Sequence, residues 1–148
     1  MSKVFHAWKS CATVNEILRT CFCQINDDIL QVVLNNDSFD IPWAEHVFTK
    51  SSRHFTPAKM QEAIYLDIMQ NIENTPPIRL NVFTEGASKS ILLISMHHAL
   101  YDAESLTVLM QDILMRYQGI PTPERPSAGA LVEYVASQDE LAAKNFWV

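Results

Sequence analysis

The sequence predicts a single α/β domain, an α+β sandwich in which helices pack on a sheet. Several stretches repeat their apolar residues every three or four positions, as one face of a helix does, and shorter β-branched runs alternate with them. A length of 148 residues suits one domain, since domains hold roughly 100 to 200 residues. With 48% apolar and 19% charged residues, the chain can build its own core, which excludes intrinsic disorder.

The first part of the chain is expected to hold a short helix followed by a β-hairpin. Apolar spacings of three and four predict the helix over residues 4–14. Apolar and β-branched residues fill 17–25 and 29–34, and the Asn-Asp-Asp triplet between them is typical of a turn. This pattern predicts two antiparallel strands.

A loop and a second helix are expected next. Residues 35–55 show no regular period, which predicts a loop with one short helical turn near residues 43–48. Thr56 and Pro57 indicate a helix start, because a hydroxyl caps the first turn and proline suits the first helical position. The period of the following apolar residues predicts a helix to about Ile72.

Two further strands are expected after the Pro76-Pro77 pair. They cover 78–83 and 90–96, and the residues between them are typical of a turn. The second strand contains the run ILLISM, which is apolar on both faces. Such a strand favours the middle of a covered sheet over an edge.

The last part of the chain is expected to be helical. An amphipathic pattern covers 104–117 and ends at Gly119 and Pro121. A proline-containing connector then leads to one or two helices over 131–147. Aromatic contacts are expected from Tyr134, Phe146 and Trp147.

Charge and glycine content exclude several classes of function. The chain has 11 basic and 17 acidic residues, a net charge of -6 and no cluster of Lys and Arg, so it lacks the charge pattern of a nucleic-acid or anionic-membrane binder. With 3 glycines it has no glycine-rich loop for a nucleotide phosphate. We therefore expect no nucleic-acid partner and no membrane partner.

The cysteines predict a reducing compartment. Cys11, Cys21 and Cys23 are odd in number and have no CxxC spacing, so free thiols are expected. The N-terminal sequence has no apolar stretch of the kind found in signal peptides. Together these features predict a cytoplasmic protein.

The candidate site is the segment HHALYDAES, between a strand and a helix. Alternation along the strand places His97 and His98 on opposite faces, so the two rings would not clamp one metal ion. A histidine at a strand end with a carboxylate four residues later, here Asp102, is a typical arrangement for a general base.

Simpler roles stay open for the same residues. Paired buried histidines are more often satisfied core or loop residues than catalytic ones. Asp102 suits the N-cap of the following helix equally well. A metal site of either histidine with Asp102 lacks a third ligand, so no metal is expected. Ser105 has no G-x-S-x-G sequence around it and is a poor candidate for a nucleophile.

This segment resembles the HHxxxDG signature of nonribosomal peptide synthetase condensation domains. It is more loosely similar to the HxxxD signature of acyltransferases with the chloramphenicol acetyltransferase fold. Upstream, NEILRTCF at 15–22 resembles the family's RHExLRTxF motif, and PIRL at 77–80 resembles its PxR strand. Residues 131–147 look like the helices that close its first lobe. The resemblance thus covers nearly the whole chain.

The resemblance implies a fold and a set of partners. Residues 1–148 would form the truncated N-terminal lobe, chloramphenicol acetyltransferase-like, of a two-lobe condensation domain. Its C-terminal lobe would complete a tunnel in which two peptidyl carrier proteins present an acyl thioester and an acceptor amine or hydroxyl. Each substrate hangs on a phosphopantetheine arm, and no cofactor binds directly. Such acyltransferases serve secondary metabolism, including siderophore assembly.

The resemblance also implies a role for each residue. His98 would be catalytic, either as a general base or by stabilising the developing ammonium ion. Asp102 would hold the loop through a buried ion pair with Arg19 or, failing that, Arg79, or else through neutral hydrogen-bond donors. His97 would be structural. In fungal cyclising and terminal condensation domains a similar pattern, xHxxxDxxS, tolerates a residue other than glycine, and Ser105 fits its last position.

Two departures from the family pattern bear on activity. Ala103 replaces the signature glycine, which adds a methyl group and costs stability if the backbone there needs a positive φ. Val14 and Asn15 replace the Arg and His of RHExLRTxF, so the usual arginine partner of Asp102 is missing. A non-catalytic binding or docking lobe is therefore the alternative function, and a stand-alone acyl-CoA transferase fits less well. We expect the isolated chain to be inactive and to expose apolar surface that favours self-association.

Overall fold

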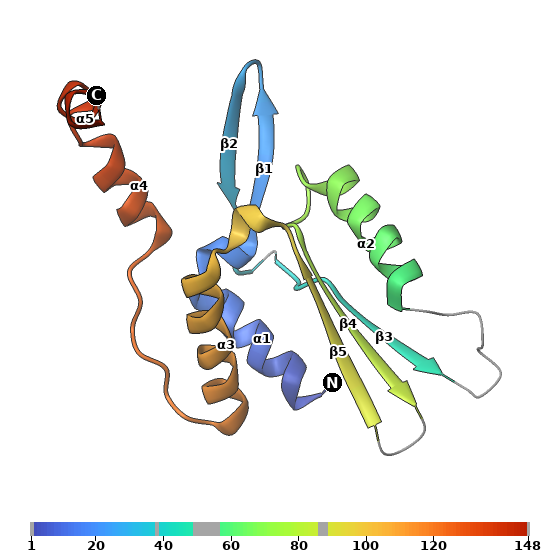
Figure 1. Ribbon diagram of the computed structural model, residues 1–148. Coiled ribbons are helices and arrows are strands. Elements are labelled where there is room, and N and C mark those ends of the chain that lie inside the picture. The colour runs from blue at the N-terminus through green and yellow to red at the C-terminus, as the bar shows by residue number, and fades with distance from the viewer. Residues whose placement is uncertain (1, 38, 49–56, 86–88, 148) are drawn as a thin grey trace.

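A computed structural model describes residues 2–37, 39–48, 57–85 and 89–147 (Figure 1). The helices are α1 (Lys3–Val14), α2 (Pro57–Asn71), α3 (Ala103–Gln118), α4 (Ala128–Ala136) and α5 (Glu140–Trp147), with short 3-10 helices η1 (Glu16–Arg19) and η2 (His98–Leu100). The strands are β1 (Thr20–Ile25), β2 (Asp28–Val33), β3 (Trp43–Phe48), β4 (Ile78–Glu85) and β5 (Lys89–Met96). This mixture of helices and sheets confirms the predicted α+β class.

The main sheet has the order β3-β4-β5 and separates two helical layers. β3 pairs with β4 in parallel, and β4 pairs with β5 antiparallel. Figure 1 shows α1 and α3 on one side of this sheet and α2 on the other. Alternation along β4 fits both layers, because Ile78 and Leu80 join the core under α1 and α3 while Arg79 reaches α2.

The core lies between α1, α3 and β4. Trp8 and Cys11 on α1 are almost completely buried, as is Leu80 on β4. From α3, Leu109 and Ile113 complete the same cluster. These positions follow the predicted periods of three and four, which is why the sequence indicated both helices correctly.

The hairpin is confirmed, but its first strand begins later than predicted. Residues Glu16–Arg19 form η1, and Thr20 closes this turn by donating a hydrogen bond from Oγ1 to the Glu16 carbonyl at 2.9 Å. The turn buries Leu18 completely. A short apolar run suits a buried turn as well as a strand, so the sequence pattern did not separate the two. Asn26 takes the left-handed φ of 55° that the hairpin turn requires.

Two predictions about the sheet are wrong. Residues 43–48 form the strand β3 rather than a helical turn in a loop. Their hydrogen bonds come from β4, more than thirty residues away, which a local pattern does not reveal. β5 was expected in the middle of the sheet, yet within the described residues it is an edge strand. Its side chains are half-buried or, as with Ile91, exposed.

The remaining predicted helices are present. α2 begins at Pro57, while Thr56 lies outside the described residues, as does the turn at 86–88. α3 ends at Gly119, which adopts a left-handed φ of 79°. α4 and α5 confirm the prediction of one or two helices at this end of the chain. The rings of Phe146 and Trp147 pack edge to face, with their centroids 5.1 Å apart.

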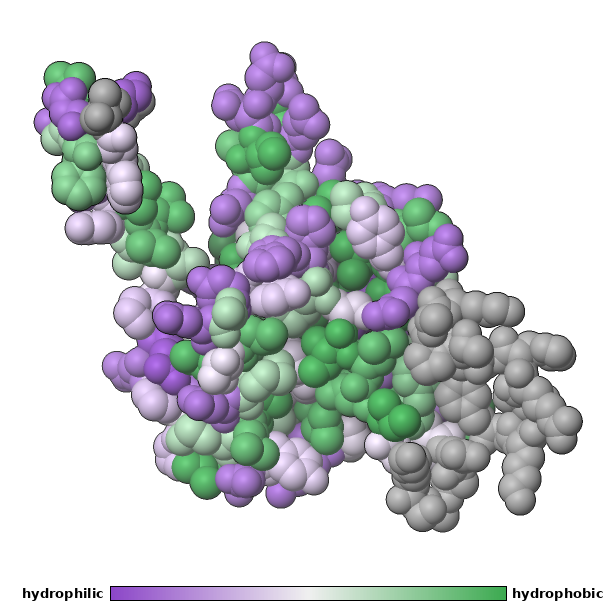
Figure 2. All heavy atoms as spheres, viewed as in Figure 1, coloured by the Kyte–Doolittle hydropathy of each residue, from purple (hydrophilic) through white to green (hydrophobic). Residues whose placement is uncertain are grey.

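α4 and α5 stand apart from the rest of the chain (Figure 1). Apolar green spheres cover much of their surface in Figure 2, and exposed residues include Leu131, Tyr134, Phe146 and Trp147. Within the described residues, no helix has the length and apolarity needed to cross a membrane. The apolar residues of α4 and α5 are thus exposed to solvent in this chain.

Candidate active site

The two histidines follow the edge strand β5, where the chain leaves the sheet. His97 is the N-cap of η2, and its Nδ1 accepts a hydrogen bond from the backbone N–H of Ala99 at 3.2 Å. The backbone N–H of His97 donates to the Pro77 carbonyl at 2.9 Å. His97 therefore shapes the local turn. The two rings have different environments. The reason is the 3-10 turn that begins at His98, and not the alternation along a strand that the sequence suggested.

His98 is exposed, and its ring lies flat against Tyr101. The ring centroids are 4.8 Å apart and the planes differ by 7°. Among the described residues, none forms a hydrogen bond with the His98 imidazole. The stack on Tyr101 limits rotation of the exposed His98 ring. The sequence analysis did not single out Tyr101, although a spacing of three residues across a turn was a usable signal.

Asp102 is exposed and caps α3. Its Oδ1 accepts hydrogen bonds from the Ser105 backbone N–H at 2.7 Å and from Ser105 Oγ at 2.6 Å. The Asp102 N–H donates to Ser105 Oγ at 2.8 Å, which completes a capping box. The Ser105 side chain, followed by its backbone N–H, lowers the pKa of Asp102. The capping role, left open by the sequence, is the one observed.

The predicted buried ion pair of Asp102 with Arg19 or Arg79 does not form, because Asp102 is exposed and both arginines bind other groups. Arg19 is buried and donates from Nε to the Ala12 carbonyl at 2.9 Å and from Nη1 to the Leu34 carbonyl. It therefore fastens the end of α1 to the end of β2. Its guanidinium is therefore already engaged by carbonyls of α1 and of the residue after β2.

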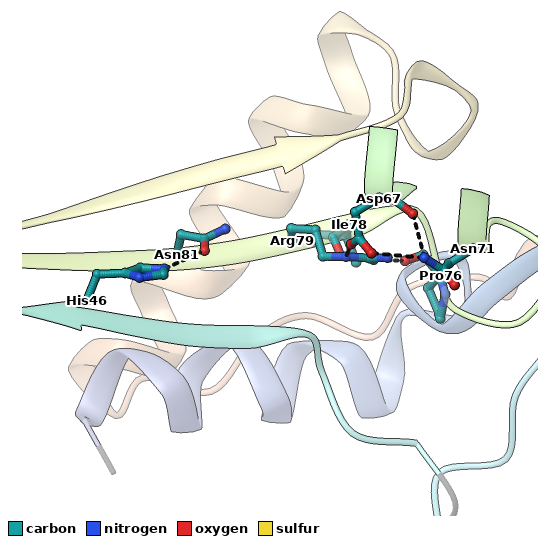
Figure 3. A network of polar contacts seen from close by, with 7 residues as sticks. All are labelled: His46, Asp67, Asn71, Pro76, Ile78, Arg79 and Asn81. Carbon is teal, nitrogen blue, oxygen red and sulfur yellow. Dashed lines mark hydrogen bonds and ion pairs between the residues drawn. The ribbon is translucent and has the colours of Figure 1, made fainter. Parts of the chain in front are cut away.

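Arg79 is likewise engaged elsewhere, in the polar network of Figure 3. Its Nε forms an ion pair with Asp67 Oδ2 at 2.5 Å, and its Nη1 donates to the Pro76 carbonyl at 2.9 Å. Asn71 Nδ2 donates to the other oxygen of the Asp67 carboxylate at 2.9 Å. The network joins the end of α2 to the start of β4, so Arg79 has a structural role on the far side of the sheet.

The departures from the family pattern leave no backbone strain. Ala103 is the first residue of α3, and Asn26 is the only described residue other than glycine with a positive φ. The extra methyl group therefore carries no conformational cost. Asn15 donates from Nδ2 to the Cys11 carbonyl at 3.0 Å, and Val14 is exposed.

A hollow of about 410 Å³ lies beside the start of α3. Its lining includes Asn15, Tyr101, Asp102 and Ser105. His98 does not line it, so the hollow follows the Asp102 side of the loop. No group of three potential metal ligands occurs in the described ranges of the chain.

A family model for the condensation domain matches residues 1–148. The nonribosomal peptide synthetase sidC of Aspergillus fumigatus is 35% identical over 144 residues, which are 96% of this chain and 3% of that protein. Coprinoferrin synthetase of Coprinopsis cinerea is 31% identical, over 99% of this chain and 6% of that protein.

The fold agrees with these sequence matches. The crystal structure of the epimerization domain from the third module of tyrocidine synthetase B has a TM-score of 0.74 and 19% identity, over 98% of this chain and 35% of that one. The chain belongs to the condensation-domain family. It spans a small part of the length of the relatives that it matches, several of which are nonribosomal peptide synthetases of fungi.

Proposed function

We propose that residues 1–148 are the N-terminal lobe of a condensation domain and that His98 is its catalytic residue. The observation that carries this proposal is the exposed His98 ring, stacked on Tyr101 and placed immediately before the Asp102-capped helix. The chain covers 35% of the length of the epimerization-domain structure with the same fold, which supports the assignment to one part of a larger domain. The site would face the C-terminal lobe of the parent domain.

The proposed reaction joins two substrates held on carrier proteins. The nitrogen or oxygen of the acceptor attacks the carbonyl carbon of the donor thioester, a C–N or C–O bond forms and the C–S bond breaks. The leaving thiol of the phosphopantetheine arm takes up the proton that the acceptor loses. His98 either accepts this proton in transit or stabilises the charged acceptor. His97 and Asp102, with Ser105, fix the loop that positions His98.

The isolated chain is expected to catalyse no condensation. Acyl transfer between two substrates needs the reacting atoms held about 3 to 3.5 Å apart. His98 is exposed in this chain, so the water that surrounds it weakens each electrostatic contact. Without a partner, the apolar surface of α4 and α5 is expected to promote self-association, which light scattering would measure against a Phe146→Ser/Trp147→Ser variant.

The test uses the complete parent domain with acyl-loaded and aminoacyl-loaded carrier proteins. The buffer is reducing, like the cytoplasm, so that the cysteine thiols stay free. His98→Ala should lower the rate of product formation by about 100-fold or more, as expected for loss of a general base. Gln111→Ala, an exposed change on α3, should leave the rate unchanged.

The second candidate is a binding lobe without turnover. It is favoured by the capping role of Asp102, because the arginine pair that the family signature implies is replaced by the Ser105 contact. Binding of loaded carriers to the complete domain with no product would support this candidate and would contradict the catalytic proposal.

A further inference from the structure

A second hollow, of about 320 Å³, lies between the start of α1 and the end of α3. From α1 it is lined by Lys3, His6, Ala7 and Ser10. Arg116 of α3 and the segment 119–121 after that helix complete the lining. None of these residues lines the hollow beside the start of α3, so the two hollows are separate features of the surface.

The lining of this second hollow is basic, although the chain has a net charge of -6. Lys3 and Arg116 supply positive charge, and the lining also includes the imidazole of His6. Of the described residues that line it, none carries a carboxylate. A concave basic surface on an acidic chain raises the local concentration of anions.

Arg116 has hydrogen-bond donors to spare. Its two terminal nitrogens donate to neutral hydroxyls, Nη1 to Ser10 Oγ at 2.6 Å and Nη2 to Thr122 Oγ1 at 2.7 Å. Its Nε is buried and has no hydrogen-bond partner among the described residues. Each terminal nitrogen carries a second N–H group, which these two contacts leave for an acceptor from a ligand.

No acidic partner neutralises Arg116 in the described part of the chain. The carboxylate one helical turn before it, Asp112, is engaged on both oxygens by Arg125, at 2.9 and 3.2 Å. Lys3 also lacks an ion pair there, and its Nζ lies 4.8 Å from the centre of the Tyr117 ring. Among the described residues, neither of these two positive charges has a carboxylate as its ion-pair partner.

We propose that this hollow binds the phosphate group of an organic phosphate ester. Guanidinium and ammonium groups beside a serine hydroxyl suit phosphate oxygens, which accept several charge-assisted hydrogen bonds. Ala7, Ile120 and Pro121 give the hollow an apolar side that suits a short aliphatic chain on the same ligand. The phosphate ester could be a phosphopantetheine arm or a free phosphate metabolite, and both share this chemistry. The proposal does not depend on turnover at His98.

The experiment titrates the 148-residue chain separately with inorganic phosphate, phosphopantetheine and pantetheine, and follows the backbone amides of Ala7, Gly119 and Ile120 by NMR. Saturable shifts with both phosphate compounds, and none with pantetheine, are expected. Tighter binding of phosphopantetheine than of inorganic phosphate supports the arm as the source, and equal affinity supports a free phosphate. Shifts with pantetheine that match those with phosphopantetheine, or no saturation with either phosphate compound, would overturn the proposal.

Three variants with a matched control complete the test. Arg116→Gln should raise the Kd for phosphopantetheine about tenfold, and Arg116→Lys should recover part of the affinity. Lys3→Gln should raise it about threefold and also carries the test if Arg116→Gln does not fold. Lys9→Gln makes the same change in net charge on α1, outside the hollow, and should leave the Kd unchanged. An equal loss in Lys9→Gln and Lys3→Gln would contradict a local site.

Discussion

Arg125 forms a two-point ion pair with Asp112 and so fastens the connector after α3 back onto that helix. Its Nη2 lies 2.9 Å from Asp112 Oδ1 and its Nε 3.2 Å from Oδ2. The two partners differ in burial, because the Asp112 side chain is 4% exposed and the Arg125 side chain 36%. Hydrogen bonding with Asp112 raises the pKa of Arg125, so the Arg125 guanidinium stays charged at any ordinary pH.

This difference in burial predicts unequal effects of removing each partner. Arg125→Gln leaves a buried carboxylate without its counter-ion and should lower the Tm by roughly 5 °C. Asp112→Asn leaves a guanidinium that water reaches, and the Tm should fall less. The double variant should be more stable than Arg125→Gln alone. Thermal unfolding followed by circular dichroism would measure all three, and equal losses in the two single variants would contradict the argument.

The capping role of Asp102 predicts how its variants behave. Asp102→Asn should keep most of the stability, since asparagine caps helices about as well as aspartate. Asp102→Ala removes the acceptor of the Ser105 hydrogen bonds and should lower the Tm. A buried ion pair would give the opposite result for Asp102→Asn, with a large loss of stability.

The same contact predicts a dependence on pH. The Ser105 hydrogen bonds lower the pKa of Asp102 below its ordinary value of 3.8, so the folded state favours the ionised carboxylate. The stability from this contact is fully present above pH 3.8 and is lost as the pH falls through the lower folded pKa. The Tm difference between the unmodified chain and Asp102→Ala should therefore shrink in acid. A constant difference over this range would show that the carboxylate charge has no part in the cap.

Ala103 is expected to be favourable where it stands. Because it begins α3 with a negative φ, restoring the family's glycine adds backbone freedom to the unfolded chain and relieves no strain. Ala103→Gly should lower the free energy of unfolding by up to about 1 kcal/mol. Urea unfolding would measure it. An increase in stability would mean that the methyl group is crowded in the fold.

The sequence predicted the helices, the hairpin and the two strands joined by a turn, because each is encoded by nearby residues. α1 and α3 keep their apolar periods, and Gly119 ends α3 where expected. β3 was missed because its partner strand lies far along the chain. The edge position of β5 was not predicted for the same reason, because the neighbours of a strand are set by the topology of the sheet and not by the strand's own residues.

The candidate site was predicted in part for a similar reason. The order of His98, Asp102 and Ser105 is local, and the structure brings Asp102 and Ser105 together within one turn of helix. The partners of Arg19 and Arg79 are set by tertiary contacts. Either arginine was expected to pair with Asp102, but in the folded chain both bind other groups. A buried arginine needs hydrogen-bond acceptors, and the packing of the folded chain decides which carbonyl or carboxylate groups accept from it.

The last prediction concerns Cys11, a free thiol buried between α1 and α3. Burial raises its pKa from 9.0 to about 11, against a smaller opposing effect of Arg116. The folded state therefore favours the neutral thiol. The resulting stability is fully present below pH 9.0, where the unfolded thiol is also neutral, and is lost as the pH rises through about 11.

Cys11→Ala removes this titration and leaves every other ionisable group in place. The free energy of unfolding of the unmodified chain should fall by about 2 kcal/mol relative to that of Cys11→Ala between these two limits. Urea unfolding at a series of alkaline pH values would measure the difference, and Cys23→Ala provides a control at a less buried thiol. Parallel curves for the unmodified chain and Cys11→Ala would contradict the prediction, because they would mean that the folded and unfolded thiols ionise together.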